Sequence, residues 1–118
     1  MENRIAVIGL GYVGLPLAHA FAKRHNVIGI DISDKRVNEL VAFDDKTLEL
    51  SSKQLKTTIG SSLHIFSDIN KSKNCNFYII TVPTPVTNSK QPDLSPVINA
   101  TKSVATILKK DDIIIFES

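Results

Sequence analysis

Cysteine and tryptophan are nearly missing from this 118-residue chain, which has one cysteine, Cys75, and no tryptophan. A single cysteine excludes an internal disulfide and any metal cluster built from several cysteines, and it fits a reducing cytoplasm. The histidines His19, His25 and His64 show no metal-ligand spacing. We therefore expect no disulfide and no bound metal, and we expect the protein to be cytoplasmic.

The chain also lacks a large net charge and long uninterrupted apolar runs. The net charge is only +2, which gives no strong basic patch for nucleic acid. Residues 5–22 are apolar, but three glycines, a proline and a histidine interrupt them, so neither a signal peptide nor a membrane span is expected. With 42% hydrophobic residues, the composition fits one globular domain, residues 1–118, with a single core.

Glycine is also scarce, yet three of the five glycines fall within six residues, as Gly9, Gly11 and Gly14. A short apolar, β-rich run precedes them. Helical residues 15–25 follow, and a second apolar run then ends at Asp31. A lone G-x-G-x-x-G is weak evidence, but this order of strand, glycine turn, helix, strand and acid is typical of a dinucleotide site.

Each glycine has a physical role in that interpretation. Gly9 permits a tight turn, Gly11 leaves room for a pyrophosphate to approach the backbone, and Gly14 lets the helix pack closely on the strand. The helix N-terminus would offer free N–H groups to the phosphates. Pro16 fits the first helical turn, where its missing N–H would have had no partner.

Asp31 and Arg36 bear on the choice of cofactor. A carboxylate at the end of the second strand can accept the ribose hydroxyl hydrogens and repel the extra phosphate of NADP, which favours NAD. The alternative is that Asp31 merely begins the next turn. Arg36 keeps NADP open, because a nearby arginine is how such sites accept it. Arg36 could equally stack on the adenine or lie in solvent.

The rest of the chain continues the α/β alternation. Apolar, β-rich runs predict further strands at residues 63–66, 77–82 and 113–116. Ser95, followed by Pro96, predicts a helix start. The prediction is a Rossmann-type doubly wound parallel sheet of about five strands, flanked by helices, with the glycine strand central. Residues 83–95 form a long loop expected to lie beside the glycines.

These residues resemble the UDP-glucose/GDP-mannose dehydrogenases, in their NAD-binding N-terminal domain. The matching stretches cover essentially the whole chain and lie at residues 7–18, 29–31, 82–85, 92–95 and 116–118. The resemblance is greatest to the UDP-N-acetylhexosamine dehydrogenases of polysaccharide synthesis. It implies oxidation of a sugar-nucleotide C6 alcohol to a carboxylate with two NAD, in a full-length protein expected to form a homo-oligomer.

The resemblance also implies which residues meet the cofactor. They are Gly9, Gly11, Tyr12, Val13, Gly14, Asp31, Arg36, Val82, Thr84, Glu117 and Ser118. The family's catalytic cysteine and its partners lie on later segments, and Cys75 does not match that cysteine by position. We therefore expect a fragment without the substrate and C-terminal domains, which binds NAD without turnover and meets the UDP-sugar only through the missing domains.

Two other functions stay open from the sequence. A non-catalytic NAD-sensing or structural module would also have this glycine loop and no catalytic residues. An S-adenosylmethionine-dependent methyltransferase also places a glycine loop and an acidic ribose contact on an α/β sheet, although the dinucleotide-type spacing disfavours it.

Overall fold

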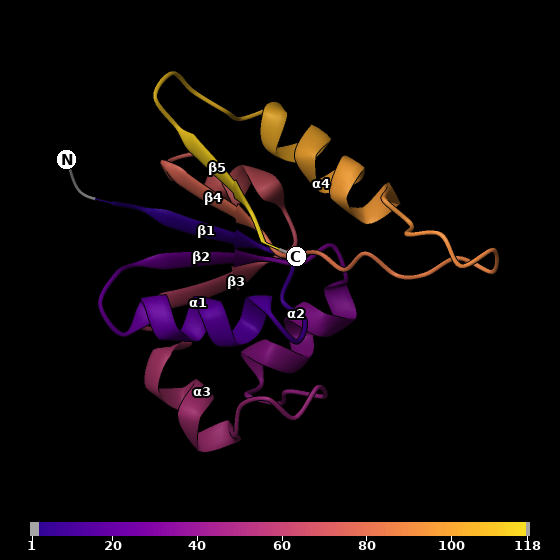
Figure 1. Cartoon of the computed structure of the whole chain (residues 1–118). Coiled ribbons are helices and arrows are strands. Elements are labelled where there is room, and N and C mark those ends of the chain that lie inside the picture. The colour runs from indigo at the N-terminus through magenta and orange to yellow at the C-terminus, as the bar shows by residue number, and fades with distance from the viewer. Residues whose placement is uncertain (1–2, 118) are drawn as a thin grey trace.

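The computed structural model describes residues 3–117 and contains one parallel sheet (Figure 1). The strands are β1 (Ile5–Ile8), β2 (Val27–Ile30), β3 (Leu63–Phe66), β4 (Phe77–Ile80) and β5 (Ile113–Phe116). Their spatial order is β3-β2-β1-β4-β5, and all four pairings are parallel. The predicted doubly wound sheet with the glycine strand in the middle is confirmed.

Helices cover both faces of the sheet. The helices are α1 (Gly14–Ala22), α2 (Asp34–Val41), α3 (Ser52–Thr58) and α4 (Ser95–Ala105), with a short 3-10 turn η1 (Ile69–Ser72). The first three pack on one face and α4 on the other (Figure 1). Within residues 3–117, no helix is long and apolar enough to span a bilayer.

Two predicted helix boundaries are wrong. The first helix ends at Ala22 instead of residue 25. Leu94 is the N-cap of α4, so Ser95 is already helical instead of capping it. The Ser95 N–H instead donates to the carboxylate of Asp93 at 2.9 Å, which satisfies one of the free donors at this helix end.

The core lies on both sides of β1, whose four residues are all buried. Ile5 and Val7 pack among the residues under α1 and α3, whereas Ala6 and Ile8 pack under α4. Successive side chains of a strand point to opposite faces, so a continuous apolar run is what a strand covered by helices on both sides requires.

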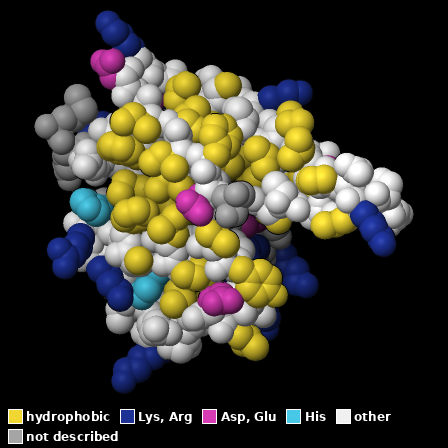
Figure 2. All heavy atoms as spheres, in the orientation of Figure 1, with side chains coloured by type: hydrophobic (Ala, Val, Ile, Leu, Met, Phe, Trp, Pro, Cys, Tyr) yellow, Lys and Arg dark blue, Asp and Glu magenta, His cyan; other side chains and the backbone are white. Residues whose placement is uncertain are grey.

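The edge strand β5 is less covered than the others. Ile113 and Ile115 are 46% and 41% exposed, on the face that α1 covers further along the sheet. Figure 2 shows hydrophobic side chains gathered on the upper part of this face. The predicted fifth strand is confirmed, but its apolar residues form surface as well as core.

His19 joins two helices in the interior. Its Nδ1 lies 2.9 Å from the Thr58 hydroxyl, so the ring bridges α1 and α3, and it is only 5% exposed. Burial, reinforced by the positive charge of Lys23, lowers the pKa of His19 below its ordinary value of 6.5. The folded state therefore takes up a proton less readily than the unfolded chain.

This shift predicts a loss of stability in mild acid. The contribution of neutral His19 is complete above pH 6.5 and is lost as the pH falls through the lower pKa of the folded state. The free energy of unfolding, measured by urea denaturation, should therefore fall less between pH 7.5 and pH 5.5 for His19→Gln than for the unmodified chain. Equal losses in the two proteins would contradict the assignment to His19.

Candidate functional site

The turn after β1 is fixed by both neighbouring strands. The N–H of Gly9 donates to the carbonyl of Ile30 in β2 at 2.7 Å. The Thr81 hydroxyl, just after β4, donates to the carbonyls of Ile8 and Gly9 at 3.1 and 2.6 Å. Gly9 has φ of +99°, and a Cβ there would lie 2.9 Å from the backbone nitrogen of Val82. The turn therefore requires glycine.

The other two glycines of the loop differ in how much space surrounds them. A Cβ on Gly14 would overlap the carbonyl oxygen of Gly9 and lie 2.5 Å from the Thr81 hydroxyl oxygen. Apart from its two chain neighbours, a Cβ on Gly11 would have no atom of the described residues within 4 Å. Gly14 thus allows the helix to approach the turn, whereas Gly11 borders open space of the kind that a phosphate group needs.

The start of α1 leaves backbone donors without an acceptor among the described residues. Within residues 3–117, no group accepts the N–H groups of residues 11–14, and the first bond of the turn runs from the N–H of Leu15 to the carbonyl of Gly11 at 3.2 Å. Free N–H groups at a helix N-terminus carry a partial positive charge. The loop can therefore bind an anionic group.

Asp31 lies where β2 ends and is part of the same site. One carboxylate oxygen accepts the N–H of Leu10 and the other that of Ser33, both at 3.0 Å. Each oxygen keeps a further lone pair for a hydroxyl hydrogen. The two backbone bonds fix the carboxylate beside the glycine loop, with acceptor capacity left for a sugar.

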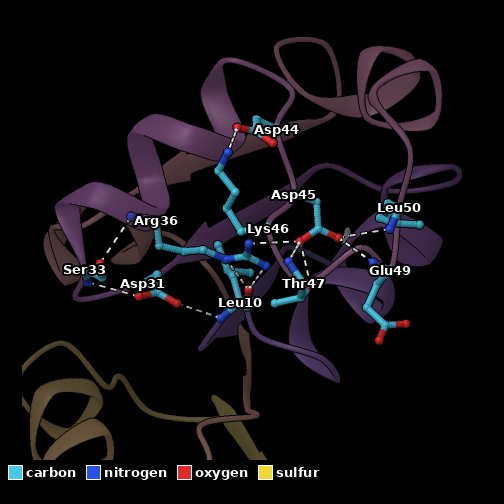
Figure 3. Close-up of polar contacts among 10 residues, drawn as sticks. All are labelled: Leu10, Asp31, Ser33, Arg36, Asp44, Asp45, Lys46, Thr47, Glu49 and Leu50. Carbon is cyan, nitrogen blue, oxygen red and sulfur yellow. Dashed lines mark hydrogen bonds and ion pairs between the residues drawn. The ribbon is translucent and has the colours of Figure 1, made fainter.

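Arg36 of α2 faces the same loop (Figure 3). Its Nε and Nη2 donate to the carbonyl of Leu10 at 2.8 and 2.6 Å, and its Nη1 donates to Asp45 at 2.9 Å. The side chain is only 12% exposed. The alternative that Arg36 lies in solvent is therefore wrong, and its main partners are protein groups.

A cleft of about 770 Å³ opens at this carboxyl edge of the sheet. Among its lining residues are these candidates from the sequence: Gly9, Gly11, Asp31, Arg36 and Val82. The loops after β1, β2 and β4 all reach this edge (Figure 1). Open parallel sheets bind ligands here, because the strand order reverses on either side of β1.

The structure does not bring every candidate into the cleft. Those outside its lining are Tyr12, Val13, Gly14, Thr84 and Glu117. Tyr12 and Val13 are 69% and 47% exposed on the outer side of the turn. Ser118 lies outside the described residues. Cofactor contacts for all of these residues stay predictions.

Sequence reasoning missed two walls of the cleft. Ser67, Asp68 and Ile69, directly after β3, form one of them, and Asn99 and Ser103 of α4 contribute to another. The end of β3 could have been found, because the carboxyl ends of parallel strands share one edge. The α4 residues had no such signal, because a helical pattern does not specify which of its residues face a cleft formed by other segments.

Cys75 is remote from this cleft. It precedes β4 and therefore lies at the amino edge of the sheet, where it is 4% exposed. Burial raises the pKa of its thiol to about 11. A thiol protonated at neutral pH is a poor nucleophile, so Cys75 acts as a small core residue.

Known proteins resemble this chain in both sequence and architecture. Residues 3–118 match the UDP-glucose/GDP-mannose dehydrogenase family, NAD binding domain. A UDP-N-acetyl-D-glucosamine 6-dehydrogenase of Salmonella typhi is 50% identical over 99% of this chain and 27% of its own length. The enzyme of the same name from Pseudomonas aeruginosa is 46% identical over the same shares.

Among solved structures, a UDP-D-ManNAc dehydrogenase from Pyrococcus horikoshii superposes with a TM-score of 0.91. Its sequence is 33% identical, over 98% of this chain and 28% of that one. The chain thus spans about a quarter of the length of the relatives it matches. Since the family match covers the glycine loop, Asp31 and every strand of the sheet, the chain belongs to the UDP-glucose/GDP-mannose dehydrogenase family, as its NAD binding domain.

Proposed function

We propose that this chain is the cofactor-binding part of a longer, cytoplasmic nucleotide-sugar dehydrogenase. The proposed reaction oxidises the C6 alcohol of a UDP-N-acetylhexosamine to a carboxylate, with two NAD as hydride acceptors. The names of the relatives from Salmonella typhi and Pseudomonas aeruginosa support this substrate class. The observation that carries the proposal is one cleft lined by both Gly11, where the run of free N–H groups begins, and Asp31.

The residues present fit NAD. The N–H groups of residues 11–14 would hold the pyrophosphate, and the open space beside Gly11 would admit it. Asp31 would accept hydrogen bonds from the adenosine ribose. The negative charge of Asp31 would repel the extra phosphate of NADP, so we propose NAD as the preferred cofactor. NAD itself supplies the hydride acceptor.

What this chain supplies is orientation. The glycine loop and the carboxylate of Asp31 are both fixed by hydrogen bonds, and they would hold two separate parts of the cofactor. Holding reactants in one geometry can lower a barrier by about 7–11 kcal/mol. Positioning of the sugar and the nucleophile is proposed to come from segments other than residues 1–118.

A titration of Asp31→Ala with NAD tests this proposal. The lost hydrogen bonds to a charged group should weaken NAD binding by about 1.5–3 kcal/mol, or roughly tenfold to a hundredfold. Asp44→Ala is the control, because Asp44 is an exposed acid paired with Lys46 and does not line the cleft.

Calorimetry should be run with NAD, NADP and S-adenosylmethionine on the same preparations. Binding of NAD by the unmodified chain, with weaker binding of the other two, supports the proposal. If folded Asp31→Ala binds NAD as tightly as the Asp44→Ala control, Asp31 is not a ribose contact. Tighter binding of S-adenosylmethionine would favour a methyltransferase instead.

A further inference from the structure

Asp45 is a buried acid that collects hydrogen bonds from several directions without lining the cleft. Its side chain is completely buried. One carboxylate oxygen accepts from Arg36 and from both the N–H and the hydroxyl of Thr47, at 2.5–2.9 Å. The other accepts the N–H groups of Glu49 and Leu50, at 2.9 and 3.0 Å. A buried charge with this many donors is strongly fixed in place.

The carboxylate of Asp45 keeps its charge at neutral pH. Burial alone would raise its pKa, but hydrogen bonds from the Thr47 hydroxyl, the Leu50 N–H and the Arg36 guanidinium outweigh burial and lower the pKa to about 2. Asp45 is therefore an anion at neutral pH, and it faces the guanidinium of Arg36. The side chain of Asp45 is wholly buried, and that of Arg36 is only 12% exposed.

The backbone around Asp45 adopts conformations that most residues avoid. Phe43 and Leu48 have φ of +63° and +60°, in the left-handed region that favours glycine. Neither residue is glycine, so the segment on both sides of Asp45 is held in place by its surroundings. Asp45 accepts the N–H groups of residues 47, 49 and 50 and thereby restrains the segment that contains Leu48.

The contact chain continues from Asp45 through Arg36 to the glycine loop (Figure 3). Two nitrogens of Arg36 donate hydrogen bonds to the carbonyl oxygen of Leu10. That carbonyl belongs to the peptide that joins Leu10 to Gly11, and the peptide is trans. In a trans peptide the C=O and N–H point in opposite directions. Holding the Leu10 carbonyl therefore also sets the direction of the Gly11 N–H.

We propose that Asp45 is a positioning residue for the cofactor. It holds the guanidinium of Arg36, Arg36 holds the Leu10 carbonyl, and the Gly11 N–H is thereby oriented for the pyrophosphate. This inference rests on the proposed NAD site. It adds that Arg36 acts chiefly through the loop instead of by its charge on the cofactor, and that a residue outside the cleft determines cofactor affinity.

Asp45→Asn and Asp44→Asn form a matched pair for the test. The two acids are neighbours in the chain, but Asp44 pairs only with Lys46 at the surface. We expect Asp45→Asn to weaken NAD binding about tenfold, the effect of one charge-assisted hydrogen bond, and Asp44→Asn to change it less than about twofold. Circular dichroism and the thermal midpoint verify that each variant is folded.

A second variant distinguishes the orienting role of Arg36 from the effect of its positive charge. Arg36→Lys keeps the positive charge but loses the planar fork that reaches Leu10 and Asp45 together. We expect it to weaken NAD binding as much as Asp45→Asn does, and we expect the double variant to be no weaker than either single one. Amide NMR spectra of the 118-residue chain should show the Gly11 signal shifted in both single variants.

The results distinguish this inference from the proposed function. If the unmodified chain does not bind NAD, both fail. If the unmodified chain binds NAD but Asp45→Asn binds it as tightly as Asp44→Asn, only the positioning role is overturned. NAD affinity in Arg36→Lys equal to that of the unmodified chain also overturns it, because charge alone would then suffice. This second result holds even if Asp45→Asn fails to fold.

Discussion

Gly11→Val should abolish measurable NAD binding while leaving the fold intact. Apart from the two chain neighbours, no atom of the described residues lies within 4 Å of a Cβ at this position. The added methyl groups therefore enter the space next to the free N–H groups instead of the core. A side chain there keeps the pyrophosphate away from the backbone donors. We expect an affinity loss of at least about a hundredfold, or about 2.7 kcal/mol.

The measurement is a calorimetric titration with NAD, accompanied by a thermal melt. The melting midpoint should stay close to that of the unmodified chain, because the substitution removes no buried contact. Unchanged NAD affinity in a folded Gly11→Val protein would mean that the ligand does not lie over this turn. The proposed site would then be wrong.

Gly14→Ala should destabilise the fold, whereas Gly11→Val should leave the fold intact. A Cβ on Gly14 would overlap the carbonyl oxygen of Gly9 and would also lie 2.5 Å from the hydroxyl oxygen of Thr81. Neither neighbour can move easily, because Thr81 bonds the carbonyls of Ile8 and Gly9 and thereby ties β4 to the turn. We expect a loss of about 3 kcal/mol in unfolding free energy, the upper range for overpacking.

Gly11→Ala is the matched control, since it makes the same substitution three residues earlier in the same loop. Its unfolding free energy should change by less than about 1 kcal/mol. Urea denaturation of the two variants compares them directly, and Gly14→Ala should also melt about 10 °C lower. Equal stability of the two proteins would show that helix α1 can shift away from β1 at little cost.

The sheet and the glycine loop could be predicted because local patterns specify them. Apolar, β-branched runs of strand length alternate with helical segments, and parallel strands need such crossovers. The glycines at positions 9 and 14 could be recognised because a glycine turn directly between a strand and a helix is a local pattern. Asp31 could be placed at the end of β2 for the same reason. The structure adds that Val82 and Thr81, from a distant segment, leave no room for a Cβ at these two glycine positions.

Arg36 shows where local reasoning ended. The sequence left its role open between cofactor phosphate, adenine and solvent, because its partners are not its neighbours. Leu10 lies 26 residues away along the chain, and Asp45 is separated from it by a turn whose path no periodic pattern reveals. Only the packing of α2 beside the glycine loop places the guanidinium of Arg36 between Leu10 and Asp45.

The sequence by itself determined the fold class, the order of the elements and the position of the glycine loop, because these depend on residue spacing within short segments. The tertiary structure decided which side chains line the cleft. It brought in Ser67 and Asn99 and left Tyr12 and Val13 on the outside. A cleft is formed by segments that meet at one edge of the sheet, and that meeting depends on how whole helices pack, which residue spacing does not specify.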